Sequence, residues 1–122
     1  MTRNSRYVGI RNALVSGVSV PVEPSFNSTG KVKDQVVINK FVYFYQDLTF
    51  DNSFNATQLV NVPISVIGSN GQKCDEIMDE VDSVMKSYQG LEIVDILESD
   101  MDMDLNDNKY YRTDVTYVCI VK

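Results

Sequence analysis

The chain has 122 residues, 43% hydrophobic and 23% charged, and a formal net charge of -6, because 17 acidic residues outnumber 11 basic ones. This length is typical of one domain, which we expect to span residues 1–122. The acidic balance argues against a protein that grips nucleic acid, since phosphate binding requires a basic surface. Histidine, the commonest general base and metal ligand, is absent.

The first elements are a helix and an extended segment. Residues 5–15 place Tyr7, Ile10 and Leu14 on one helical stripe. The next segment alternates valines with polar residues and contains prolines, which cannot donate to a sheet ladder, so we expect an edge strand or an extended arm. Its members Val20, Pro21, Val22 and Pro24 are candidates for a subunit interface. Residues 25–33 are polar and predict a loop.

Residues 35–50 are rich in β-branched and aromatic side chains and predict one strand, or two with a bulge at Asn39–Lys40. Between residues 41 and 45 both faces are apolar, so this strand is either enclosed in the fold or presents one face to a partner. The candidate contacts here are Phe41, Tyr43 and Tyr45. Residues 51–57 predict a second polar loop.

A strand followed by an amphipathic helix is predicted between residues 60 and 90. Alternating apolar residues from Val60 to Val66 indicate a strand with one buried face. Ser69 and Gln72 have the spacing of a capping box, and Gly90 is expected as a left-handed C-cap. One helical stripe is apolar; it contains Cys74, Ile77, Met78, Val81, Val84, Met85 and Tyr88.

The last 30 residues predict a long β-hairpin with its turn at residues 106–108. Its first strand alternates apolar and acidic residues, so we expect the apolar side chains to face the core and the carboxylates to face water. The apolar set is Leu91, Ile93, Leu97, Met101, Met103 and Leu105. We therefore expect an α+β domain: an antiparallel sheet with the N-terminal helix and one long amphipathic helix packed on one face, closed by the hairpin.

The acidic residues of this strand are the one group with a chemical character, namely Glu98, Asp100, Asp102 and Asp104. The series resembles the start of a calcium loop, but Leu105 and Tyr111 stand where an EF-hand needs Gly and Glu. We expect no metal and no cofactor. A row of carboxylates repels itself, so it is expected to face either a basic neighbouring subunit or a lumen that passes DNA without binding it.

Other chemistry is weakly supported. Cys74 and Cys119 lie at apolar positions and are expected to be buried free thiols, with a disulfide as the alternative. Two basic groups, neither of them dense, are expected on a solvated surface: Arg3, Arg6 and Arg11 near the start, and later Lys31, Lys33 and Lys40. No apolar run approaches the length of a membrane span, and the N-terminus does not have the apolar core of a signal peptide. We expect no enzymatic activity.

The order of elements resembles the small tail-completion and tail-terminator proteins of tailed bacteriophages, which join head to tail. The most family-like piece runs from Val66 through Gly68 to Gly71 and into the helix. The resemblance implies a ring, commonly a hexamer, that ends the tail tube and meets both the tube protein and the head connector. It also implies that DNA passes through the centre and that the protein is made in the host cytoplasm and resides in the virion at the head–tail junction.

A second interpretation belongs to a different class. The chain would then be a stand-alone regulatory or small-molecule-binding α+β domain, monomeric or dimeric. Its expected sign is a pocket between helix and sheet. The assembly state separates the two interpretations.

Overall fold

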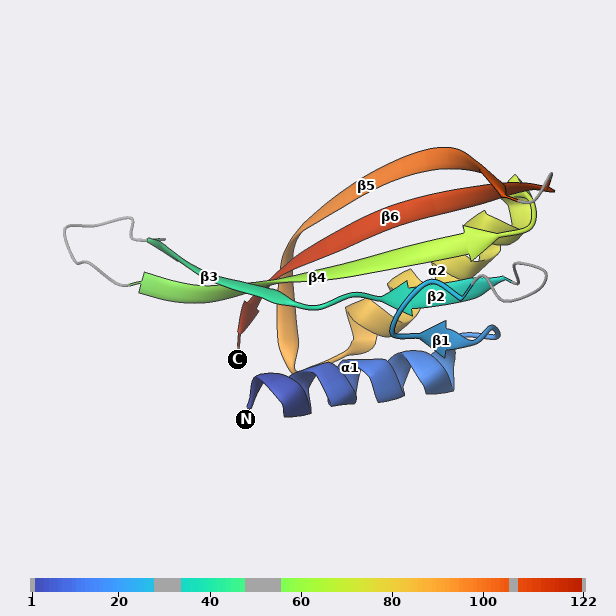
Figure 1. The fold of residues 1–122 in the computed structure, drawn as a ribbon. Coiled ribbons are helices and arrows are strands. Elements are labelled where there is room, and N and C mark those ends of the chain that lie inside the picture. Colours follow the sequence, from blue (N-terminus) through green and yellow to red (C-terminus); the bar gives the residue numbers. More distant parts are fainter. Residues whose placement is uncertain (1, 28–33, 48–55, 106–107, 122) are drawn as a thin grey trace.

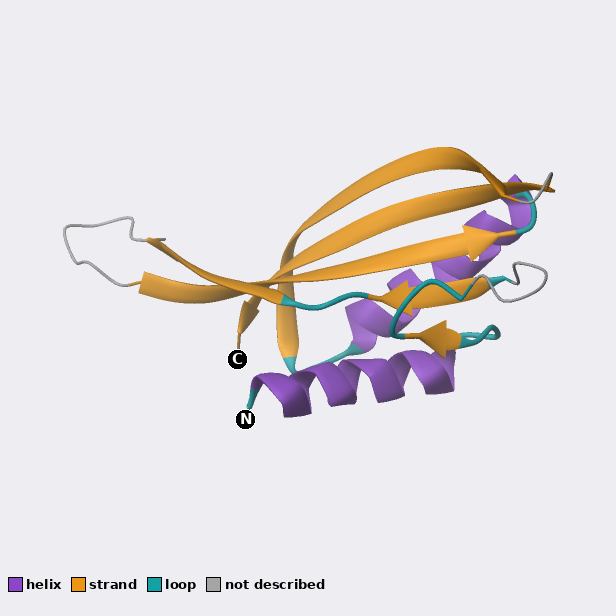
Figure 2. Cartoon of the chain, viewed as in Figure 1, coloured by secondary structure: helices purple, strands orange, loops and turns teal. Residues whose placement is uncertain are grey.

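The computed structural model describes residues 2–27, 34–47, 56–105 and 108–121. Within these residues two helices, α1 (Arg3–Gly17) and α2 (Gly71–Ser87), lie against one face of a six-stranded sheet (Figures 1 and 2). The strands are β1 (Val22–Glu23), β2 (Gln35–Ile38), β3 (Val42–Asp47), β4 (Ala56–Gly68), β5 (Leu91–Leu105) and β6 (Asn108–Val121). The α+β class and the C-terminal hairpin are confirmed.

The sheet is mixed rather than wholly antiparallel. Its order is β1-β2-β4-β6-β5, and β3 pairs with the same edge of β4 as β2 does. Only the two-residue β1 runs parallel to its neighbour, with Val22 opposite Val36. Parts of both predicted loops, 28–33 and 51–55, and residues 106–107 of the predicted turn lie outside the described residues.

The core forms between β4 and the two helices. Val60, Val62, Ile64 and Val66 alternate along β4 and are at most 1% exposed. Against them pack the apolar stripe of α2 and the buried side of α1, including Ile10. Removing this apolar surface from water is the main stabilising contribution, on the order of 25 cal/mol per Å². The predicted strand, helix and stripe are thus confirmed.

At Pro63, the strand that pairs with this edge of β4 changes from β2 to β3. The Pro63 carbonyl accepts a hydrogen bond from the backbone N–H of Asn39 at 3.0 Å. Because proline has no backbone N–H, Pro63 cannot donate a second hydrogen bond back to Asn39, and the ladder ends there. The register of β4 against β2 therefore differs from its register against β3. The predicted division of this segment into two strands is confirmed.

The ends of α2 differ from the prediction. Asn70, not Ser69, is the N-cap, and its side chain accepts from the N–H of Lys73 at 2.8 Å. Ser69 instead donates its own N–H to Asp34 at 2.6 Å, so the capping box is wrong. Gly90 is not in the left-handed region, and its close neighbour is the Tyr88 ring, which an added Cβ would meet at 2.7 Å.

A β-bulge at Val94 changes which side chains of β5 face the helices. Ile93 lies opposite Cys119, but the next pair is Asp95 with Val118, so Val94 is the extra residue. Because strand side chains alternate, one inserted residue exchanges the two faces of everything that follows. The expectation that carboxylates face away from the core side is therefore wrong beyond Val94.

The consequence is visible in the exposure of the two sets. Asp100 lies opposite Thr113 on the helix side of the sheet. Leu97 and Met101 lie on the helix-free side and are 57% and 46% exposed. Of the expected core-facing residues of β5, only Leu91 and Ile93, before the bulge, lie against the main core.

The junction of β4 and α2 generates a stability prediction. A Cβ at Gly68 would lie 2.6 Å from the backbone nitrogen of Cys74, whereas one at Gly71 would meet nothing within 4 Å. We expect Gly68→Ala to lower the free energy of unfolding by about 1–3 kcal/mol, as overpacking does. Gly71→Ala, the matched control, should be neutral or stabilising by at most about 1 kcal/mol. Urea denaturation measures both, and equal effects would contradict the close contact.

Candidate assembly surfaces

The proline-containing arm is paired with its own chain. Val20 and Val22 are half-buried against the main core, and the Val36 N–H donates to the carbonyl of Pro21 at 2.9 Å. Pro21 and Pro24 are exposed. The arm therefore covers one sheet edge within the protomer, and only its prolines are presented outward.

The three aromatic candidates lie in three different environments. Phe41 is 5% exposed and packs on Tyr7, with ring centroids 5.2 Å apart. Tyr43 is half-buried beneath two arginines. Tyr45 is 67% exposed and lies where β4 pairs with β3 alone, in the two-stranded extension that projects from the body (Figure 1). Tyr45 and, in part, Tyr43 are thus accessible in the protomer.

Arg3 and Arg6 lie over the Tyr43 ring, and Lys40 lines the same cavity as Arg3 and Tyr43; we call these three basic residues the basic cluster. The Arg6 Nη1 donates to the Tyr43 hydroxyl at 3.0 Å, and the Arg3 guanidinium lies 4.4 Å from the centre of the ring. Arg3, Lys40 and Tyr43 line a cavity of 390 Å³ between α1 and the β2–β3 junction. The sequence did not predict this grouping.

Arg6 carries a buried charge. It is 5% exposed, and its Nε has no hydrogen-bond partner. The ion pairs formed among the described residues do not include Arg6 or Arg3. An unpaired buried guanidinium is costly, because low-dielectric surroundings do not replace its hydration. The expectation of a solvated Arg6 is wrong.

The acidic residues of β5 face the helix side of the sheet. Glu98, Asp100, Asp102 and Asp104 occupy alternating positions there, and we call them the acidic surface, together with Asp75 and Asp82 of α2. Asp75, Asp100 and Asp102 line one small cavity of 160 Å³. The main sheet contacts of α2 are with β4 and β6, and the part of β5 that follows the bulge is largely uncovered on this side, where Glu98, Asp100, Asp102 and Asp104 are exposed.

Few cations neutralise the acidic surface. Asp102 pairs with Lys109 at 3.4 Å and Asp82 with Lys86 at 3.8 Å. Asp100 accepts a hydrogen bond from the Thr113 hydroxyl at 2.6 Å. The described part of the chain contains no group of three or more His, Cys, Asp or Glu residues that could hold a metal ion.

The acidic surface also perturbs a buried phenol. Tyr117 is fully buried and donates its hydroxyl hydrogen to Asp82. Burial, the hydrogen bond to Asp82 and the nearby charges of Asp82 and Glu98 all raise the pKa of Tyr117. Burial likewise raises the pKa of the Cys74 thiol, and that of Cys119 to about 11. Both cysteines are buried and free, as expected.

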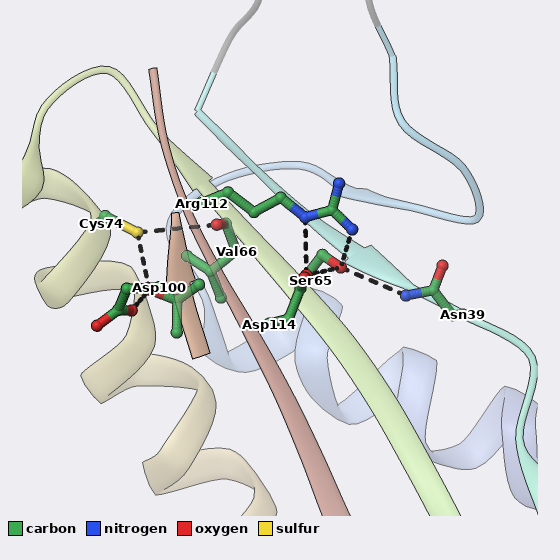
Figure 3. A network of polar contacts seen from close by, with 8 residues as sticks. Asn39, Ser65, Val66, Cys74, Asp100, Arg112 and Asp114 are labelled. Carbon is green, nitrogen blue, oxygen red and sulfur yellow. Dashed lines mark hydrogen bonds and ion pairs between the residues drawn. The ribbon is translucent and has the colours of Figure 1, made fainter. Parts of the chain in front are cut away.

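The helix-free face of the sheet combines polar and apolar parts. Arg112 donates to Asp114 at 2.7 Å, and Ser65 donates to the same carboxylate oxygen at 2.7 Å (Figure 3). Next to this network on β5 lie the exposed Leu97 and Met101. A strand with exposed apolar side chains and one unpaired edge is a typical site of association.

Comparisons with known proteins give similarities in structure but not in sequence. No protein-family model matches the sequence, and no curated protein is similar to it. A chain of the virion of a native gene transfer agent particle is similar in structure, with a TM-score of 0.46 and 13% identity, over 96% of this chain and 90% of that one. Because the TM-score is below 0.5, we take the function from this chain's own surfaces. Among the described residues, no helix is long and apolar enough to cross a membrane.

The crowded carboxylates generate a second prediction. Glu98 lies near Asp82 and forms no ion pair with a described residue. We expect Glu98→Gln to raise the free energy of unfolding of the isolated protomer by about 0.2–1 kcal/mol at low salt, since like charges repel. The gain should shrink in 0.5 M salt, where screening is stronger. Glu92→Gln, on the helix-free side of the same strand, is the control and should change little.

A third prediction concerns alkaline pH. The pKa of Tyr117 is raised in the folded state, so its contribution to stability is present below a pH of about 10 and is lost as the pH rises further. Tyr117→Phe should therefore show a shallower loss of stability between pH 9 and 11 than the wild type. At pH 7 it should be less stable by about 1–3 kcal/mol, since the hydrogen bond to Asp82 is lost. Parallel pH profiles would contradict this assignment.

Proposed function

We propose that this chain is a structural protein of a tailed-bacteriophage virion. In this proposal it stands at the head–tail junction, where copies form a ring, with six as the expected number. The ring terminates or completes the tail tube and joins it to the head connector, and DNA passes through its lumen. The protein performs no catalysis.

The observation that carries the proposal is the open edge strand β5. It is 15 residues long and pairs with a neighbour, β6, along one edge only. Leu97 and Met101 remain exposed on one of its faces, while carboxylates occupy the other. Such a strand is a liability in an isolated monomer, because it offers backbone groups and apolar area to another chain. An obligate assembly, in which β5 meets a neighbouring copy, removes that liability.

The sequence supports the particular assembly. The order of a short helix, a proline-containing arm, a hydrophobic strand, a strand–turn–helix unit and a closing hairpin resembles tail-completion and tail-terminator proteins. The overall charge of -6 suits a wall that DNA slides past without binding. The exposed Tyr45 and the two-stranded extension that carries it offer a contact to the tube or connector.

The second candidate is a ligand-binding domain, and it is favoured by the cavity beside α1. That cavity has a volume of 390 Å³, which suits a small molecule, and Arg3 and Lys40 would select an anion. In that case the chain would bind its ligand as a monomer or dimer.

Assembly state tests the proposal. We expect native mass spectrometry over 1–500 µM to show a closed oligomer, and electron microscopy to show rings with a central hole. A chain that stays monomeric or dimeric over the whole range would contradict the ring. Binding of a small anion to that monomer would then favour the second candidate.

A further inference from the structure

Among the described residues, the basic cluster has no acidic partner within its own protomer. Arg6 is nine-tenths buried, its Nε is unpartnered, and its side chain hydrogen-bonds, among the described residues, to the neutral hydroxyl of Tyr43. Because Arg6 donates to that hydroxyl, the phenolic hydrogen is left to donate outward. Arg3 and Lys40 are exposed beside it. The cluster is therefore a positive, donor-rich surface on a protein whose net charge is negative.

The same protomer contains the acidic surface, where carboxylates lack cationic partners. Glu98 and Asp104 are exposed, and neither forms an ion pair with a described residue. Asp102 and Asp82 are paired, but with exposed lysines at 3.4 Å and 3.8 Å, and such pairs contribute little. Each surface thus lacks the charge that the other carries in excess.

The two surfaces lie at opposite edges of the sheet. The basic cluster surrounds β3 and the end of β2, whereas the acidic surface follows β5, and β4 and β6 separate them. Each of these edges also has backbone groups without a strand partner among the described residues, where β3 pairs with β4 alone and β5 with β6 alone. A contact between opposite edges joins two different patches, so it is head-to-tail, and head-to-tail contacts form rings when their rotation closes.

We propose that the basic cluster of one copy receives the acidic surface of the next copy, and that this contact sets the direction of the ring. The inference rests on the proposed ring and names the surfaces that form it. A second copy is the favoured occupant because it supplies carboxylates in a row beside a free strand edge, at a matching place on every protomer. A free nucleic acid would instead meet a chain of net charge -6.

Charge reversal tests the direction of the contact. The first variant, Arg3→Glu with Lys40→Glu, makes both surfaces acidic. The second, Glu98→Lys with Asp104→Lys, reverses the two carboxylates of the acidic surface that we selected as unpaired and so brings positive side chains opposite the basic cluster. All four positions are exposed, and none of these side chains forms an ion pair within the described chain. Circular dichroism and urea midpoints verify that each variant is folded.

We expect each variant alone to need about tenfold or more protein than the wild type for half-assembly at low salt, since like charges then meet. A chain that combines all four changes should assemble like the wild type. An equimolar mixture of the first and second variants should also assemble, because the introduced charges then meet opposite charges at one contact and the two unaltered surfaces meet at the next. Restoration by mixing is specific to a head-to-tail contact between these two surfaces.

Matched controls carry equal charge changes elsewhere. Arg11→Glu with Lys73→Glu controls for the first variant, and Glu92→Lys with Glu76→Lys for the second; both should assemble like the wild type. If the wild type forms rings and the reversals leave them unchanged, or mixing fails to restore them, this contact is wrong and the ring stands. If the wild type forms no ring at any concentration, both proposals fall. Inhibition of assembly by short oligonucleotides, with no response to the acidic reversals, would assign the basic cluster to nucleic acid instead.

Discussion

Strand β4 is the constraint on which the rest of the molecule depends. Both of its edges are paired, with β2 and β3 on one side and β6 on the other. One face carries the four valine and isoleucine side chains against the helices, and the other supplies Ile67 to a smaller cluster with Val37 and Tyr110. Its last residue, Gly68, then touches the backbone of α2 directly. Both edges of the sheet, and the surfaces on them, take their positions from this strand.

The basic cluster and the acidic surface both carry charge that the described part of the protomer does not neutralise. Among the described residues, the charges of the protomer are not balanced locally, since Arg6 is buried without a carboxylate and β5 carries carboxylates with few cations beside them. An unpaired buried charge destabilises a protein whose stability is already marginal. In the proposed ring, a neighbouring copy would supply the missing charge to both surfaces through one contact, which is why we treat the two surfaces together.

The sequence predicted the elements with long, regular patterns. Period two in β4 and period 3.6 in α2 each extend over enough residues to exclude other assignments, and both were found. The α2 cap was missed because Ser69 and Asn70 are adjacent and both suit an N-cap; the contact of Ser69 with the distant Asp34 decides between them. The edge strand β1 was among the expectations for the proline-containing arm, but its parallel direction was not predicted, because two residues carry no pattern that sets a direction.

The burial of Arg6 and the bulge at Val94 differ in how far the sequence could have predicted them. Arg6 was expected in solvent, yet it precedes Ile10 by four residues and so belongs to the buried stripe of α1. That signal was present and was outweighed by the usual exposure of arginine. The bulge at Val94 had a weaker signal, because the run from Ile93 to Leu97 has apolar residues in both phases and only pairing with β6 selects one.

The bulge also affects how such chains diverge. Deleting a single codon at Val94 would remove the extra residue and leave both halves of the hairpin able to pair. Asp95 would still lie opposite Val118 and Glu98 opposite Val115, so the carboxylates would stay on the helix side. A one-residue gap at the bulge is therefore compatible with an unchanged surface, whereas a one-residue deletion in the regular stretch after it would move every later side chain to the opposite face.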